Sequence, residues 1–307
     1  MESKKKAFLL LAFGGAESLD SVEPFIKNVL KGRPVTPELV EKTRERYKLI
    51  GGKSPLLDIT RNQAAAIKAL IEKEGLDYKP YVGMRYWNPF IKDTLCQMKA
   101  DGIEEAVAII MAPFASRVAT GGYITDAENA LNELNKTLKV EFVPSWHLKP
   151  LFLEAVVDNL KKELAYFQRP EDALVIFSNH SLPWVALEGD AYEMLVNQTV
   201  TEVVKRTGKI DYKVAYQSKG QGPREWLGPS TEEVIQNAGK AGKKGVIVVP
   251  LGFVADHIET LYDIDILFKG IAESSGLVFR RSASLNTSPK LMELFAGLIM
   301  KHGEKRQ

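Results

Sequence analysis

The most constraining feature of this chain is the alternation of short, continuous apolar runs with longer segments of helical periodicity. Strands of parallel sheets are apolar throughout because helices cover both of their faces. Eight such runs, the last of them weak, predict strands at 7–13, 78–84, 105–111, 139–144, 173–178, 212–217, 245–251 and 277–280. The segments between them predict helices at about 20–31, 37–50, 58–74, 88–100, 120–136, 150–168, 189–207, 229–241, 255–270 and 288–302. This alternation is typical of α/β proteins with parallel sheets and right-handed crossovers.

The apolar runs divide evenly near residues 146–151, with four on either side. A single eight-stranded sheet would also satisfy the pattern. We expect two similar Rossmann-like lobes instead, each a four-stranded parallel sheet flanked by helices, with a cleft between them. The N-terminal lobe is expected at 1–148 and the C-terminal lobe at 149–287. The last helix, at about 288–307, begins with Ser288-Pro289, and it can pack on the first lobe.

Composition excludes several classes of protein. The net charge of +2 indicates no polyelectrolyte partner, so no nucleic acid is expected. The single cysteine, Cys96, excludes an intrachain disulfide and a four-cysteine iron–sulfur cluster. Its surroundings predict a place in the core or at the boundary of a helix. A reducing, cytoplasmic setting fits this cysteine usage.

The N-terminus imitates a signal peptide, because Lys4-Lys5-Lys6 precedes the apolar residues 7–13. The apolar region is at the short limit, and Gly14-Gly15 suits a turn after a strand equally well. We therefore interpret residues 7–13 as the first strand. No run of about 18 apolar residues occurs, so we expect no integral membrane segment.

Two of the predicted strands end beside side chains that can bind metals or transfer protons. His180 follows the run 173–178, and His257 and Glu259 follow the run 245–251. In open parallel sheets, ligands bind outside the carboxyl ends of the strands. An imidazole at a strand end can stay neutral and accept a proton near its ordinary pKa of about 6.5. The alternative for His180 is a side chain that only hydrogen-bonds its own loop.

A cluster of acidic residues follows the second of these strands. On a helix, Glu259 and Asp263 lie on one face, and Asp256 adjoins them three residues earlier. Near a helix start their charge suits the helix dipole, which is the alternative to a functional role. The interleaved apolar residues indicate partial burial instead, where carboxylates need protons, cations or donors as partners. The glycine pairs of the first lobe form neither a dinucleotide-binding fingerprint nor a phosphate-binding loop.

Taken together, the segments 46–55, 83–90, 177–183, 216–229 and 249–263 resemble ferrochelatases, the enzymes that insert ferrous iron into a porphyrin to make haem. The resemblance extends along nearly the whole chain. The His-Ser-Leu-Pro motif at 180–183 and the Asp-His-Ile-Glu-Thr-Leu-Tyr motif at 256–262 are specific in combination. The resemblance implies two α/β lobes with a porphyrin cleft between them, in agreement with the strand count.

The resemblance also implies roles for particular residues. His180 and Glu259 match the pair at the metal-insertion site, as catalytic and metal-binding residues, with Asp263 behind them as a secondary acid. Residues expected to bind the porphyrin are Phe13, Arg46, Tyr47, Ser54 and Tyr123. Ferrous iron is then a substrate, and neither a permanently bound cofactor nor an iron–sulfur cluster is expected. We expect a monomeric enzyme of the cytoplasm that releases two pyrrole protons.

Three positions depart from the pattern of compact bacterial ferrochelatases. Phe13 replaces a tyrosine that can contact the metal, and Leu30 replaces an arginine near a propionate, for which Lys31 can substitute. Leu267 interrupts a series of acidic residues that usually continues there. The choice between protoporphyrin IX and coproporphyrin III therefore stays open. Two alternatives also stay open: a chelatase for another metal, such as cobalt with a sirohydrochlorin, and a non-enzymatic haem- or metal-binding protein.

Overall fold

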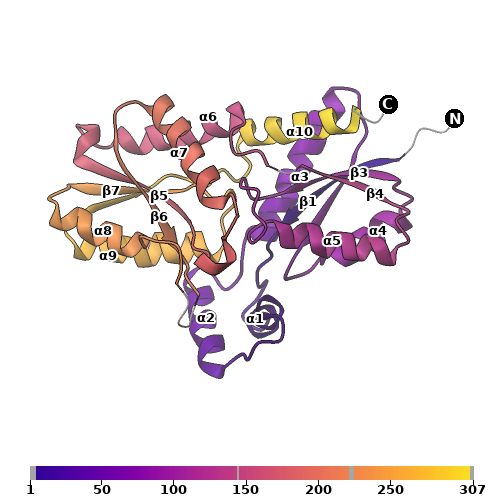
Figure 1. Ribbon diagram of the computed structural model, residues 1–307, viewed down its shortest axis with the longest axis horizontal. Coiled ribbons are helices and arrows are strands. Elements are labelled where there is room, and N and C mark those ends of the chain that lie inside the picture. Colours follow the sequence, from indigo (N-terminus) through magenta and orange to yellow (C-terminus); the bar gives the residue numbers. More distant parts are fainter. Residues whose placement is uncertain (1–4, 144, 221–224, 305–307) are drawn as a thin grey trace. The chain divides into compact units, whose positions relative to one another are not determined.

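The computed structural model describes residues 5–143, 145–220 and 225–304 (Figure 1). The chain forms two compact units. Unit 1 contains Met1–Pro113, Thr120–Trp146 and Asn286–Gln307, and unit 2 contains Phe114–Ala119 and His147–Leu285. The chain therefore crosses between the units more than once, and its last segment returns to the first unit.

Each unit is built around one four-stranded parallel sheet. The sheet of unit 1 has the order β2-β1-β3-β4, with β1 (Lys6–Ala12), β2 (Lys79–Met84), β3 (Glu105–Ile110) and β4 (Lys139–Val143). The sheet of unit 2 has the order β6-β5-β7-β8, with β5 (Ala173–His180), β6 (Asp211–Gln217), β7 (Gly245–Pro250) and β8 (Val278–Arg281). The predicted fold class, two four-stranded parallel sheets flanked by helices, is confirmed, and the single eight-stranded sheet is excluded.

The two sheets share one topology and one register. When strands are counted from the start of each unit, both orders read second, first, third and fourth. In unit 1, Ala7 of the central strand lies opposite Lys79, the first residue of β2. In unit 2, Leu174 lies opposite Asp211, the first residue of β6. Corresponding positions in the two sheets can therefore be matched residue by residue.

Helices cover both faces of each sheet, as Figure 1 shows for each unit. In unit 1, α3 (Leu56–Lys73) and α10 (Pro289–Glu304) cover one face, and α4 (Ile91–Ala100) and α5 (Gly121–Glu133) cover the other. The remaining helices of this unit, α1 (Val22–Leu30) and α2 (Pro37–Leu49), pack against each other. In unit 2, α6 (Pro150–Leu164) packs with α7 (Tyr192–Thr207), and α8 (Thr231–Lys240) packs with α9 (Lys269–Ser274).

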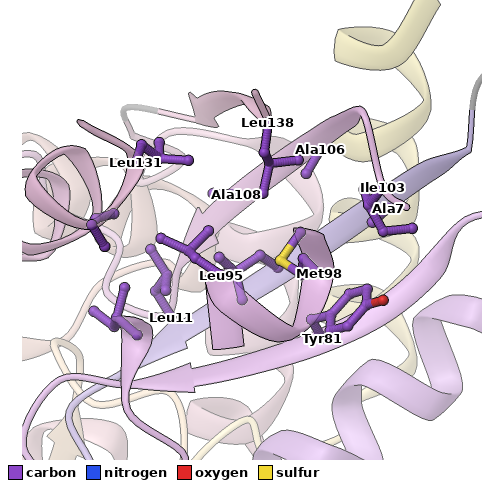
Figure 2. Packing of buried hydrophobic residues seen from close by; sticks show 14 of the residues in the cluster. Ala7, Leu11, Tyr81, Leu95, Met98, Ile103, Ala106, Ala108, Leu131 and Leu138 are labelled. Carbon is purple, nitrogen blue, oxygen red and sulfur yellow. The ribbon is translucent and has the colours of Figure 1, made fainter. Parts of the chain in front are cut away.

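The core of unit 1 explains why its strands are apolar without alternation. Every residue of β1 from Ala7 to Leu11 is fully buried, because successive side chains point to opposite faces and both faces are covered. On one face, Leu95 and Met98 of α4 pack in a cluster with Leu11 (Figure 2). Burying a side chain of this size stabilises the fold by about 1.5–3 kcal/mol.

Two local expectations were wrong. Cys96 is exposed on α4, because the apolar face of that helix is formed by Ile91, Leu95 and Met98. The helix expected over 255–270 is found as the π-helix η3 (Glu259–Phe268), which continues into α9, but the expected place of Asp256 on it was wrong. Asp256 lies in the loop before this helix, so it does not share a helical face with Glu259 and Asp263.

Candidate active site

His180 is the last residue of β5, at the carboxyl end of the sheet of unit 2. Its Nδ1 lies 2.5 Å from the carbonyl oxygen of Ser181. A carbonyl can only accept, so Nδ1 carries a hydrogen, and in the neutral form of the ring the lone pair lies on Nε2. The buried hydroxyl of Tyr192 donates to the carbonyl of His180 at 3.0 Å and fixes the main chain here.

Glu259 is the first residue of the π-helix, and the structure brings it beside His180. Its Oε1 lies 3.7 Å from His180 Nε2, and the two side chains are 25% and 38% exposed. With the proton of the neutral ring on Nδ1, both facing atoms carry lone pairs and neither donates. Such a pair attracts a proton or a cation into the space between its members.

A second histidine flanks the other oxygen of Glu259. His257 Nε2 lies 4.0 Å from Glu259 Oε2, and its Nδ1 lies 3.1 Å from the carbonyl oxygen of Ala255. Burial lowers the pKa of His257, because a buried ring resists charging, although the nearby Glu259 carboxylate opposes this shift. Glu259 Oε2 is buried and has no hydrogen-bond partner among the residues that the structure describes. His257 was expected from its place after a strand to be able to bind a metal or transfer a proton, but the resemblance gave it no role; the signal for one was its place two residues before Glu259.

The other two acids of this segment have different partners. Asp263 is buried on the π-helix, and its Oδ2 accepts a hydrogen bond from Ser218 Oγ at 2.8 Å. Asp256 is bonded by the guanidinium of Arg281 and accepts from Ser284 Oγ at 2.8 Å. Both acids therefore have the hydrogen-bonding partners that were expected of buried carboxylates here. The partners of Asp256 are Arg281 and Ser284, so this acid stabilises the loop before the π-helix.

In unit 1, two of the residues expected to bind the porphyrin belong to one aromatic and cationic group. Phe13 follows β1, and the centroid of its ring lies 4.6 Å from the centroid of the Tyr86 ring. The guanidinium carbon of Arg85 lies 5.0 Å from the ring centroid of Tyr86 and 5.2 Å from the ring centroid of Tyr123. Arg85 is held by Asp126 at 2.8 Å. Arg85 and Tyr86 were not assigned to the site from the sequence, although they lie in the segment 83–90 that carries the resemblance.

Three more of these residues lie on α2 or at the loop that follows it. The buried hydroxyl of Tyr47 accepts from the backbone N–H of Ala16 at 3.1 Å. The main-chain N–H of Ser54 donates to the carbonyl of Ala16 at 2.8 Å, so both residues contact the loop after β1. Gly15 lies against Tyr47 and Ser54. A Cβ at this position would lie 2.5 Å from Ser54 Oγ, which is too close for a larger residue. Arg46 lies on α2 and is partly buried.

The three departures from the bacterial pattern have clear places in the fold. Leu30 ends α1, and Lys31 follows it in the left-handed conformation. Lys31 Nζ lies 3.5 Å from Asp126 and 5.6 Å from the ring of Tyr86, which adds a second cation to the group around Arg85. Leu267 lies on the π-helix and is partly exposed.

Two features are absent from the part of the chain that the structure describes. Within 5–143, 145–220 and 225–304, no group of three or more His, Cys, Asp or Glu side chains is arranged to hold a metal ion. Nor does any helix in these ranges combine the length and the apolar character needed to cross a bilayer.

Solved structures with the same fold include a sirohydrochlorin chelatase. SirB from Bacillus subtilis with Fe3+ superposes with a TM-score of 0.58 and 10% identity, covering 97% of this chain and 95% of that one. The sirohydrochlorin chelatase SirB from Bacillus subtilis subspecies spizizenii, in complex with cobalt, gives a TM-score of 0.57 and 10% identity, covering 98% and 96%. At this identity the likeness establishes the fold alone, and the fold is that of the chelatases.

The sequence comparisons define the family within this class. The family model for ferrochelatase matches residues 5–303. A ferrochelatase from Geotalea uraniireducens is 38% identical, covering 97% of this chain and 98% of that protein. A coproporphyrin III ferrochelatase from Halalkalibacterium halodurans is 34% identical, covering 98% of each. The chain belongs to the ferrochelatase family, which places it among the porphyrin metal chelatases.

Proposed function

We propose that this protein is a ferrochelatase that inserts ferrous iron into a free-base porphyrin, protoporphyrin IX or coproporphyrin III, with release of two protons. The observation that carries the proposal is the pair formed by His180 Nε2 and Glu259 Oε1, 3.7 Å apart at the carboxyl end of a parallel sheet. Membership of the ferrochelatase family supports the same reaction. Ferrous iron is a substrate in this proposal, and no resident cofactor takes part.

The reaction sets two demands on the protein. A flat porphyrin keeps its four nitrogen lone pairs in the ring plane, where a hydrated cation cannot reach them. Binding energy that bends the ring exposes these lone pairs and so favours the transition state over the free substrate. The incoming metal also displaces two pyrrole protons, which need an acceptor within hydrogen-bond reach.

His180 meets the second demand in this proposal. Its Nδ1–H is bonded to the carbonyl of Ser181, so Nε2 is the free basic atom of the neutral ring. An imidazole nitrogen that carries a lone pair can accept a proton and pass it on. His180 is therefore our choice for the base that takes the pyrrole protons.

Glu259 holds the cation or passes the protons onward. A unit charge about 4 Å from its carboxylate is stabilised by about 4 kcal/mol at the effective dielectric constant usual near a protein surface. His257, whose pKa burial lowers, supplies a neutral nitrogen beside the second carboxylate oxygen. Asp263, on the same π-helix, supplies a further acid behind this pair.

The residues of unit 1 supply groups that suit a porphyrin. The guanidinium of the partly buried Arg46 can bind carboxylate side chains of the macrocycle, whereas Tyr47 and Ser54 are buried and can shape the site through the loop after β1. The half-exposed ring of Phe13 offers an apolar surface for the macrocycle itself. Since phenylalanine has no ligand atom, we expect no axial metal bond from this position.

A steady-state assay tests the proposal. Purified protein is mixed anaerobically with ferrous, cobalt or zinc ions and with protoporphyrin IX, coproporphyrin III or sirohydrochlorin, and the absorbance change of metal insertion is followed. We expect ferrous iron to be inserted into at least one of the two porphyrins far faster than in the absence of protein. Activity with sirohydrochlorin alone would support the alternative chelatase. Tight porphyrin binding without any insertion would support the non-enzymatic alternative.

A further inference from the structure

Gln217 contacts both functional segments of unit 2, although it carries no role in the reaction proposed above. It is the last residue of β6 and is 1% exposed. In the parallel ladder it lies opposite His180. Its carbonyl accepts a hydrogen bond from the N–H of Ser181 at 2.8 Å. The main chain of Gln217 therefore fixes the end of the strand that carries His180.

The side chain of Gln217 holds the other segment. Its Nε2 donates to the carbonyl oxygen of Glu259 at 2.9 Å. Its Oε1 accepts from Ser178 Oγ at 2.6 Å, and Ser178 Oγ lies 3.0 Å from the buried hydroxyl of Thr231. The carbonyl of Glu259 can only accept, so the NH2 end of the amide must face it. The orientation of the amide is thus forced by its surroundings.

This bond acts at the point where the π-helix begins. Glu259 is the first residue of η3, so a bond to its carbonyl fixes the main chain that carries the catalytic carboxylate. π-Helical turns are rare and frequently occur at functional sites. Gln217 contacts the strand end at His180 through its main chain and Glu259 through its side chain, so it links the two main-chain segments that carry the pair.

We propose that Gln217 is a positioning residue that sets the distance between His180 Nε2 and Glu259 Oε1. This inference rests on the proposed function, because it assigns a purpose to the same pair. Misplacement of a reacting group by about 1 Å can slow a reaction by about 100-fold. Loss of a group that supports a metal-binding side chain typically lowers affinity or activity by about 10–100-fold.

The decisive variant is Gln217→Met, which keeps the length of the side chain and removes both ends of the amide. We expect kcat for ferrous iron insertion to fall by about 10–100-fold and KM for the metal to rise. The dissociation constant for the free porphyrin, measured by fluorescence quenching, should stay within about twofold of wild type, since the residues proposed to bind the porphyrin lie in unit 1. A general loss of structure would weaken porphyrin binding as well, so it would not change kcat and the KM for the metal while leaving the porphyrin dissociation constant unchanged.

Two further variants make the result specific. Thr231→Val disturbs the same buried hydroxyl network but leaves the bond from Gln217 to Glu259, so we expect kcat close to that of wild type. Gln217→Glu keeps the shape of the side chain and places an oxygen against the carbonyl of Glu259, so we expect a loss at least as large as that of Gln217→Met. If Gln217→Met does not fold, as judged by circular dichroism, the Gln217→Glu variant decides.

Several outcomes would overturn the inference. One is a folded Gln217→Met or Gln217→Glu variant with kcat within about twofold of wild type. Another is a Thr231→Val variant that loses as much activity as Gln217→Met, because packing alone would then explain the effect. A wild-type protein that inserts no metal into any porphyrin would instead refute the proposed function, and the two failures are therefore distinguishable.

Discussion

Glu259→Gln is the substitution that tests the proposed chemistry most directly. Glutamine keeps the shape of the side chain and removes its charge. A unit positive charge between Glu259 and His180 lies within about 4 Å of the carboxylate, where the interaction is worth about 4 kcal/mol at an effective dielectric constant of about 20. Glu259 is a quarter exposed, so solvent screens part of this energy. We take roughly 2–3 kcal/mol as the loss, which corresponds to an insertion rate about 100-fold lower.

The assay is anaerobic insertion of ferrous iron, followed by the absorbance of the metallated porphyrin under single-turnover conditions. A fluorescence titration with the free porphyrin is run in parallel, and its dissociation constant should be unchanged. Glu273→Gln is the matched control, because it makes the same chemical change at an exposed position of α9. An insertion rate for Glu259→Gln within about threefold of wild type would refute the reasoning, since the carboxylate would then act on no developing charge.

Three other predictions follow from the same structure. His180→Ala should lower the insertion rate by more than about 100-fold while porphyrin binding persists, as measured by the same two assays. Arg281→Met should lower the free energy of unfolding in urea by roughly 3 kcal/mol, because Asp256 and Asp265 lose the guanidinium that binds both; an unchanged midpoint would contradict this. Burial lowers the pKa of His147 below its unfolded value, so wild-type stability should fall as pH drops below about 6.5. His147→Gln should lose less stability over that range, and equal slopes for the two proteins would exclude this cause.

The strands could be predicted from the sequence because their environment leaves a simple pattern. Residues 7–11 are apolar without interruption, and the structure buries every one of them between two layers of helices. The same argument identified β8 only weakly, since Val278 is exposed at the edge of its sheet. Edge strands are covered less completely, so their sequences carry less of the apolar signal.

The site could be predicted only in part. Strand ends locate His180 near Glu259 in general terms, because the carboxyl ends of parallel strands meet at one edge. Sequence spacing could not show that Asp256 bonds to Arg281, since that contact joins residues 25 positions apart, with η3, α9 and most of β8 between them. Nor could it show the π-helix, because a pattern of apolar residues does not distinguish a wide turn from an ordinary one over ten residues.

The shared register of the two sheets matches Phe13 with His180. Ala7 and Leu174 occupy the same place in their sheets, and each of these two residues lies six positions further along the chain. One topology has therefore been used twice, with a hydrocarbon ring at this position in one copy and a proton-exchanging ring in the other. The repeated scaffold specifies where a side chain emerges, and at this position a phenyl ring has no atom that can exchange a proton, whereas an imidazole has two.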